Sequence, residues 1–74
     1  MDNSIFNLGD LVKLSPYGEA TLGTNPVGER LIGKNGFIIS QLTEKIGLVG
    51  YHVRFVNEDP IFLSVDELTL IKSA

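Results

Sequence analysis

The sequence predicts an all-β domain in which five short strands close into a small barrel. Apolar and polar residues alternate over Tyr51–Val56, as expected for a strand with one buried side and one solvent-facing side. The turn-forming residues Asn57–Pro60 follow, and the apolar run Ile61–Val65 then pairs back as a hairpin. No stretch shows the period of a helix of ordinary length. We expect closure into a barrel because open strand edges in so small a sheet favour aggregation.

Length and composition restrict the chain to one domain, residues 1–74, with a lead-in over 1–7 and a tail over 72–74. A domain of this size buries only about 60% of the surface that its unfolded chain exposes. The chain has no cysteine, so it has no disulfide, thiolate metal site or thiol nucleophile. Its stability must therefore come from tight packing or from a partner protein.

Charge and hydropathy argue against two kinds of partner. Nine acidic and six basic residues give a net charge of −3, and the basic residues are scattered singly along the chain. Nucleic-acid binding uses clustered Lys and Arg, so we expect no nucleic-acid partner. The first residues lack the regions of a signal peptide, and no apolar run approaches the roughly 20 residues of a membrane helix. We therefore expect a cytoplasmic protein that does not insert into membranes.

The first half of the chain is predicted to contain one strand and a long loop. Met1–Asn7 is a polar lead-in whose Ile5 and Phe6 are expected to tuck under the barrel. Leu11–Leu14 is the first strand. Residues 15–34 contain four glycines and two prolines without a helical or strand period, and an ordered loop of about 20 residues is usually functional. Alternatively, the apolar residues of this loop cap one open end of the barrel.

The second half is predicted to contain the other four strands. A 3₁₀ turn is expected over Asp66–Leu68, with Asp66 starting the turn and Leu68 entering the core. Five strands, a long first loop and a short 3₁₀ turn before the last strand are the pattern of an SH3-like barrel. The four strands expected here are Phe37–Leu42, Tyr51–Val56, Ile61–Val65 and Thr69–Ile71, with a connection over residues 43–50.

Three groups of residues suggest chemistry, and each has a simpler structural explanation. Gly28–Asn35 nearly matches a phosphate-binding loop, but Asn35 replaces the magnesium-binding hydroxyl and a strand is expected where a helix should begin. His52 is the only histidine and has no metal-ligand spacing around it. We therefore predict no catalytic residue, no cofactor and no metal ligand. The acidic residues of the last third lie at solvated turn positions: Glu58, Asp59, Asp66 and Glu67.

The chain resembles the small SH3-like subunits of photosynthetic redox complexes. The motifs that carry the resemblance are GDLVKL (9–14), GKNGFI (33–38), YHVRF (51–55) and IFLSVDELTLI (61–71). The variable chain of ferredoxin–thioredoxin reductase is the nearer match, and the peripheral stromal subunit of photosystem I has a shorter first loop. The resemblance implies a non-catalytic subunit that stabilises a partner carrying the cofactor. Leu48–Gly50 departs from the variable chain, which has Pro and Asn there.

Two other interpretations of the function compete with that of a redox-complex subunit. The Gly-Asp-x-Val start is similar to type II dihydrofolate reductase, whose active site forms from a Val-Gln-Ile-Tyr strand at the centre of a tetramer. Ile61–Leu63 occupies the corresponding region here and lacks the Gln and Tyr groups, which argues against an enzyme. A phage- or plasmid-type protein that modulates a host enzyme is the stronger alternative, because such proteins are often short, acidic and cysteine-free.

The predicted function is that of a non-catalytic protein-interaction module. The long first loop, with the 43–50 connection beside it, is the expected contact surface, in which a polar rim surrounds a few apolar anchors. Tyr17 is either exposed or folded over the barrel mouth. Replacing both Tyr17 and Leu31 by alanine is expected to weaken partner binding without lowering the melting temperature. The predicted partner-binding residues are Tyr17, Leu22, Val27, Arg30, Leu31, Lys34, His52 and Arg54.

Overall fold

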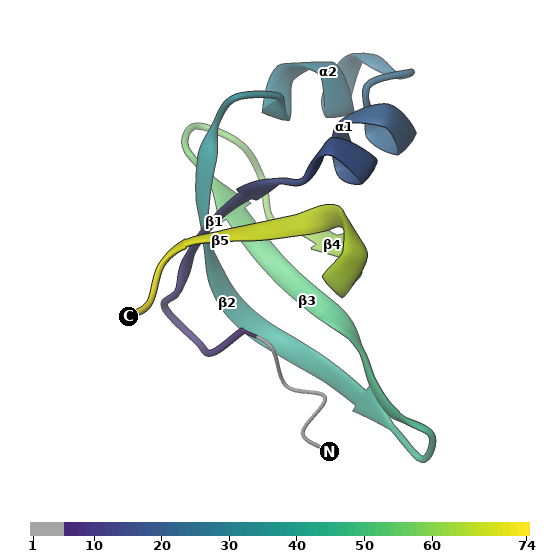
Figure 1. Cartoon of the computed structure of the whole chain (residues 1–74), viewed down its shortest axis with the longest axis vertical. Coiled ribbons are helices and arrows are strands. Elements are labelled where there is room, and N and C mark those ends of the chain that lie inside the picture. Colours follow the sequence, from purple (N-terminus) through teal and green to yellow (C-terminus); the bar gives the residue numbers. More distant parts are fainter. Residues whose placement is uncertain (1–5) are drawn as a thin grey trace.

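Five antiparallel strands form a single sheet in the order β4-β3-β2-β1-β5 (Figure 1), which confirms the all-β prediction. The computed structural model describes residues 6–74. Its elements are β1 (Leu11–Leu14), α1 (Pro16–Leu22), α2 (Pro26–Leu31), β2 (Asn35–Glu44), β3 (Gly47–Phe55), β4 (Ile61–Leu63), η1 (Val65–Glu67) and β5 (Leu68–Lys72).

The sheet is open, so the predicted closure into a barrel is not found. β4 pairs only with β3, and β5 pairs only with β1, among the residues that the structure describes. The physical reason is that β4 contains only three residues before η1 turns the chain toward β1. β4 and β5 therefore remain the two edges of the sheet.

The core lies on one side of this curved sheet, where alternate strand residues gather. Tyr51, Val53 and Phe55 of β3 are all at most 1% exposed, which confirms the alternation predicted for this strand. Leu68 is also buried, as predicted. The full set of buried apolar residues is Phe6, Val12, Leu14, Leu31, Ile38, Tyr51, Val53, Phe55, Leu63 and Leu68.

Phe6, the first described residue of the lead-in, is buried in the core as predicted, whereas Ile5 lies outside the described residues. The Phe6 N–H donates to the Tyr51 hydroxyl at 3.1 Å, and the two rings meet edge to face with centroids 5.3 Å apart. Buried Asp10 accepts hydrogen bonds from the backbone N–H groups of Asn7 and Ala74, both at 2.8 Å. These bonds lower the pKa of Asp10 and hold Asn7, before β1, and Ala74 to the same carboxylate.

Residues 15–34 contain two short helices, so the prediction of a loop without regular structure was wrong. Both helices begin in the same way: Ser15 and Asn25 are the N-caps, and a proline occupies the first helical position. The Ser15 hydroxyl accepts from the Gly18 N–H at 3.0 Å, and the Asn25 side-chain oxygen accepts from the Gly28 N–H at 2.8 Å. With seven and six residues, the helices are too short to show a helical period in the sequence.

The glycine in the first turn of each helix allows close packing. A Cβ at Gly18 would overlap the backbone carbonyl of Glu67, and a Cβ at Gly28 would overlap that of Leu22. α1 therefore packs against η1, and α2 packs against α1. The Ser15 hydroxyl strengthens the first contact by donating to the Asp66 carbonyl at 2.6 Å.

Two further local predictions need correction. The 43–50 connection is not a loop, because β2 and β3 extend through it to a tight turn at residues 45–46. The 3₁₀ turn begins at Val65 rather than Asp66, and Ser64 is its N-cap. The Ser64 N–H donates to the Glu67 carboxylate at 2.9 Å, so Glu67 and not Asp66 fixes the start of this turn.

Candidate protein-binding site

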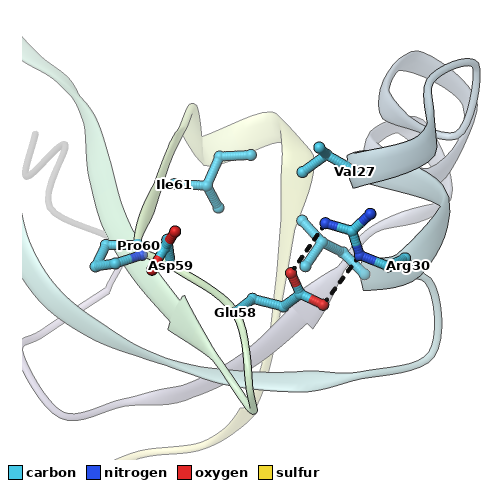
Figure 2. A pocket seen from close by; sticks show the side chains of 7 residues that line it. Val27, Arg30, Glu58, Asp59, Pro60 and Ile61 are labelled. Carbon is cyan, nitrogen blue, oxygen red and sulfur yellow. Dashed lines mark hydrogen bonds and ion pairs between the residues drawn. The ribbon is translucent and has the colours of Figure 1, made fainter.

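A pocket of about 200 Å³ opens between α2 and the turn that joins β3 to β4 (Figure 2). Its walls come from two segments that are far apart in the sequence. α2 supplies one wall, and the turn with the start of β4 supplies the other. The lining residues are Val27, Arg30, Leu31, Glu58, Asp59, Pro60 and Ile61.

Local backbone geometry places the two walls. Asn25 and Pro26 start α2, which turns Val27 and Arg30 toward the pocket while Leu31 enters the core. On the other wall, Asn57 adopts a left-handed conformation with φ 62°, and the Glu58 N–H donates to the Phe55 carbonyl at 3.1 Å. Asn tolerates this conformation better than most residues. The tight turn brings the Glu58 side chain back toward α2.

Glu58 joins the two walls by pairing with two cations. The Arg30 guanidinium donates to both Glu58 carboxylate oxygens, Nε at 3.2 Å and Nη2 at 3.3 Å, and Lys34 Nζ lies 3.3 Å from Oε2. The Glu58 side chain is only 13% exposed, whereas that of Arg30 is 54% exposed. The hydrogen bonds from Arg30 and then from Lys34 lower the pKa of Glu58, and the bond to Glu58 raises the pKa of Arg30.

The pocket combines an apolar floor with a charged rim. Leu31 is 1% exposed, and Ile61 is partly buried against the core, so the floor of the pocket is continuous with the core. Val27 remains 47% exposed at the entrance. An apolar cavity of about 150 Å³ holds one benzene molecule, and pockets for drug-sized ligands start at about 300 Å³. The pocket is therefore the size of a single apolar side chain.

The structure brings together half of the residues predicted to bind a partner. Val27, Arg30 and Leu31 line the pocket, and Lys34 lies on its rim through Glu58. Tyr17 is 58% exposed, which decides between its two predicted positions, but it does not line the pocket. The remaining three lie elsewhere: Leu22 packs against the core, and His52 and Arg54 are on the solvent side of β3.

Two expectations about this surface are corrected. Leu31 belongs to the core, so replacing it by alanine must lower the stability of the fold. The 43–50 segment was expected beside the long first loop, but the β2–β3 turn and the two helices lie at opposite ends of the molecule (Figure 1). Both errors follow from treating residues 15–34 as a loop, which gave no basis for separating an inner from an outer face.

Sequence reasoning missed the second wall of the pocket. Glu58 and Asp59 were interpreted as solvated turn residues, and Pro60 as part of the same turn. The pairing of Arg30 with Glu58 spans 28 positions and leaves no local pattern. The signal that was available is the repeated pattern Ser-Pro-Tyr-Gly-Glu and Asn-Pro-Val-Gly-Glu at residues 15–19 and 25–29, which is typical of helix starts.

No group of three or more His, Cys, Asp and Glu side chains within residues 6–74 is arranged to hold a metal ion. No helix in the described part of the chain is long and apolar enough to cross a membrane. Comparison with protein-family models, curated proteins and solved structures finds no match to this chain.

Proposed function

We propose that the protein is a non-catalytic protein-interaction domain that binds an apolar side chain of its partner in the pocket between α2 and the β3–β4 turn. The observation that supports this proposal is the combination of an apolar floor with the Arg30–Glu58 ion pair at the rim. Protein interfaces combine the same features, a desolvated apolar centre and a polar surround. Arg30 is partly exposed and is therefore available for a partner's carboxylate or carbonyl.

The pocket alone is too small to hold a partner. Burial of one Leu or Phe side chain contributes about 1.5–3 kcal/mol, whereas a complex with a Kd of 1 mM requires about 4 kcal/mol. Neighbouring surface must therefore take part, and exposed residues such as Tyr17 on α1 are suited to it. The partner in this proposal presents a short segment with one apolar anchor and polar flanking groups.

An SH3-like relationship, without closure of the sheet into a barrel, and a redox-complex partner remain part of this proposal. Five antiparallel strands, a long connection after β1 and a 3₁₀ turn before β5 support an SH3-like relationship. The resemblance of the sequence to small subunits of redox complexes supports a partner that carries its own cofactor.

A capture experiment with matched variants tests the proposal. The full-length chain is immobilised, and proteins bound from an extract of its native host are quantified by mass spectrometry. Val27→Glu places a charge at the pocket entrance, and Ile46→Glu makes a comparable change on the exposed β2–β3 turn. We expect captured partners to fall at least tenfold with Val27→Glu and to remain with Ile46→Glu, since about 1.4 kcal/mol corresponds to tenfold.

Thermal unfolding of both variants is the control for folding. Val27 is 47% exposed and Ile46 is 89% exposed, so the midpoint should stay near that of the wild type. Equal capture by wild type and Val27→Glu would show that this pocket does not bind the partner. Loss of capture with Ile46→Glu alone would place the contact at the hairpin turn instead.

A further inference from the structure

The side of the sheet that faces away from the core gathers aromatic and basic side chains. Strand residues alternate between the two sides, so the neighbours of buried Val12, Ile38 and Val53 point outward. Strand pairing arranges outward-facing residues in two rows, and Ser40 and Phe62 join them through their pairing with His52. The first row is Leu11, Phe37 and Arg54, and the second is Ser40, His52 and Phe62. We call these six residues, together with Lys13 on the same side of β1, the outer face.

Phe62 is held in place on the outer face. Its ring lies over Gly50, where an added Cβ would be only 2.6 Å from Phe62 Cζ. The ring also meets the His52 ring edge to face, with centroids 5.2 Å apart and an interplanar angle of 61°. Phe62 nevertheless remains 40% exposed. A ring fixed against backbone on one side and open to water on the other is ready to stack on a planar group.

Phe37 provides a second exposed ring, since it is 51% exposed. It pairs with Arg54 across β2 and β3, and Phe62 lies on the far side of β3. From the spacing of strands and of residues along them, the two phenylalanine backbones are about 12 Å apart. The strand between them carries the Arg54 guanidinium and the His52 imidazole.

Charges are separated between the outer face and the rest of the molecule. No residue of the outer face is acidic, and within residues 6–74 Lys13 and Arg54 form no ion pair. Lys72 adds an exposed cation, because it pairs with Leu11 across β1 and β5. Asp10 is buried and Glu44 lies at the far end of β2, beside the β2–β3 turn. The other described carboxylates belong to the helices, the β3–β4 turn and η1: Glu19, Glu29, Glu58, Asp59, Asp66 and Glu67.

This separation changes what the net charge of −3 implies. The sequence argued against a nucleic-acid partner because its basic residues are scattered along the chain and outnumbered. Strand pairing brings Lys13, Arg54 and Lys72 to one side of the sheet. Of the other three basic residues, Arg30 and Lys34 pair with Glu58 near the helices, and Lys45 lies on the β2–β3 turn. The net charge is thus an average over a cationic face and an acidic remainder.

We infer that the outer face binds single-stranded DNA, with bases stacked on Phe37 and Phe62 and phosphates beside Arg54, Lys13 and the neighbouring Lys72. Exposed rings on a sheet with cations between them are the features that bind unpaired strands, whose bases are free to stack. Ser40 and His52, the uncharged polar residues of the outer face, bond to each other at 3.1 Å, and the comparison of oligothymidylate with oligouridylate decides between DNA and RNA. This surface is separate from the pocket at α2.

The inference is tested by fluorescence anisotropy with a labelled oligothymidylate of about 12 nucleotides, within the usual site sizes for such surfaces. We expect binding to the full-length chain at low salt. With three cations at phosphates, the logarithm of the association constant should fall with the logarithm of salt concentration with a slope of about −2. Phe37→Ala and Phe62→Ala should each weaken binding about tenfold or more, because each removes one stacked base.

Matched variants and probes separate this binding from its alternatives. Tyr17→Ala removes an equally exposed ring from α1, and Val27→Glu alters the α2 pocket, so both should leave oligothymidylate affinity unchanged. Retained binding in both phenylalanine variants, or no binding by the wild type at low salt, would overturn the inference. Tighter binding of oligouridylate would overturn the choice of DNA, and equal binding of polyglutamate would reduce the face to a general anion site for acidic proteins.

Discussion

Replacing Tyr51 by phenylalanine removes one hydroxyl from the centre of the core and leaves the ring in place. That hydroxyl accepts the hydrogen bond from the Phe6 N–H at 3.1 Å, and both residues are at most 3% exposed. The substitution leaves no cavity of the size of a methyl group or a ring, so the change in stability reports on the loss of the hydrogen bond. The Phe6 N–H loses its partner in the core, and a buried donor without a partner costs about 1–3 kcal/mol.

The corresponding change in melting temperature is measurable. A change of 1 kcal/mol shifts the midpoint of a domain of this size by about 4–8 °C, so a loss of about 2 kcal/mol predicts a decrease of about 8–16 °C. Thermal and urea unfolding followed by circular dichroism give both quantities. Tyr17→Phe is the matched control, because it removes the same hydroxyl from an exposed ring and should change stability by less than about 0.5 kcal/mol. If Tyr51→Phe is as stable as this control, the Phe6 amide is not buried against the core and the anchoring of Phe6 is refuted.

Three further predictions concern a core residue of α2, the glycines in and after α2, and two ionised carboxylates. Leu31→Ala should lower the free energy of unfolding by about 2–5 kcal/mol in urea titrations, because Leu31 is fully buried; a change near zero would place it outside the core. Gly28→Ala should destabilise the protein more than Gly33→Ala, because a methyl group at Gly28 meets the Leu22 carbonyl. A methyl group at Gly33 has open space, so that variant incurs only the cost of a left-handed backbone, about 1–2 kcal/mol. The reverse order in the same titrations would exclude close packing of α1 and α2. The folded-state pKa values of Asp10 and Glu58 are lowered, so their stabilisation is complete above the unfolded-state pKa values and is lost as the pH falls through the folded-state values. The melting temperature should thus decrease as the pH falls below about 4, and this decrease should be less steep in Glu58→Gln than in the wild type. Equal pH profiles of the two proteins would contradict a stabilising role for the ionised Glu58 carboxylate.

The strands were predictable where a period of two is visible within a few residues. Tyr51, Val53 and Phe55 alternate with polar residues, and the sequence alone places them correctly on the buried side. The ends of β2 and β3 were not predictable in this way. Cross-strand pairing extends both strands to the turn at residues 45–46, and the β-bulge after Ile38 shifts the register.

The helices and the pocket were missed for different reasons. Helices of six and seven residues carry too few turns for a period to appear, although Ser15-Pro16 and Asn25-Pro26 are recognisable helix starts. Without α2, nothing in the sequence distinguishes buried Leu31 from exposed Val27. The second wall depends on a contact between Arg30 and Glu58, and no local pattern in the sequence indicates which distant charges will meet.

Glu58 connects the two proposed surfaces, because it determines which cations remain available to ligands. It holds Arg30 and Lys34 at the pocket, so these two cations do not add to the cationic character of the outer face. Glu58→Gln removes that charge and releases both cations near α2. If the two surfaces are independent, this variant alters partner capture through the pocket but leaves the salt dependence of oligothymidylate binding unchanged, since that dependence counts only cations at phosphates. Lys13→Gln should instead leave partner capture unchanged and make the slope of the salt dependence less steep by about 0.7. A steeper dependence in Glu58→Gln would mean that the strand also reaches the helices and that the two surfaces are one.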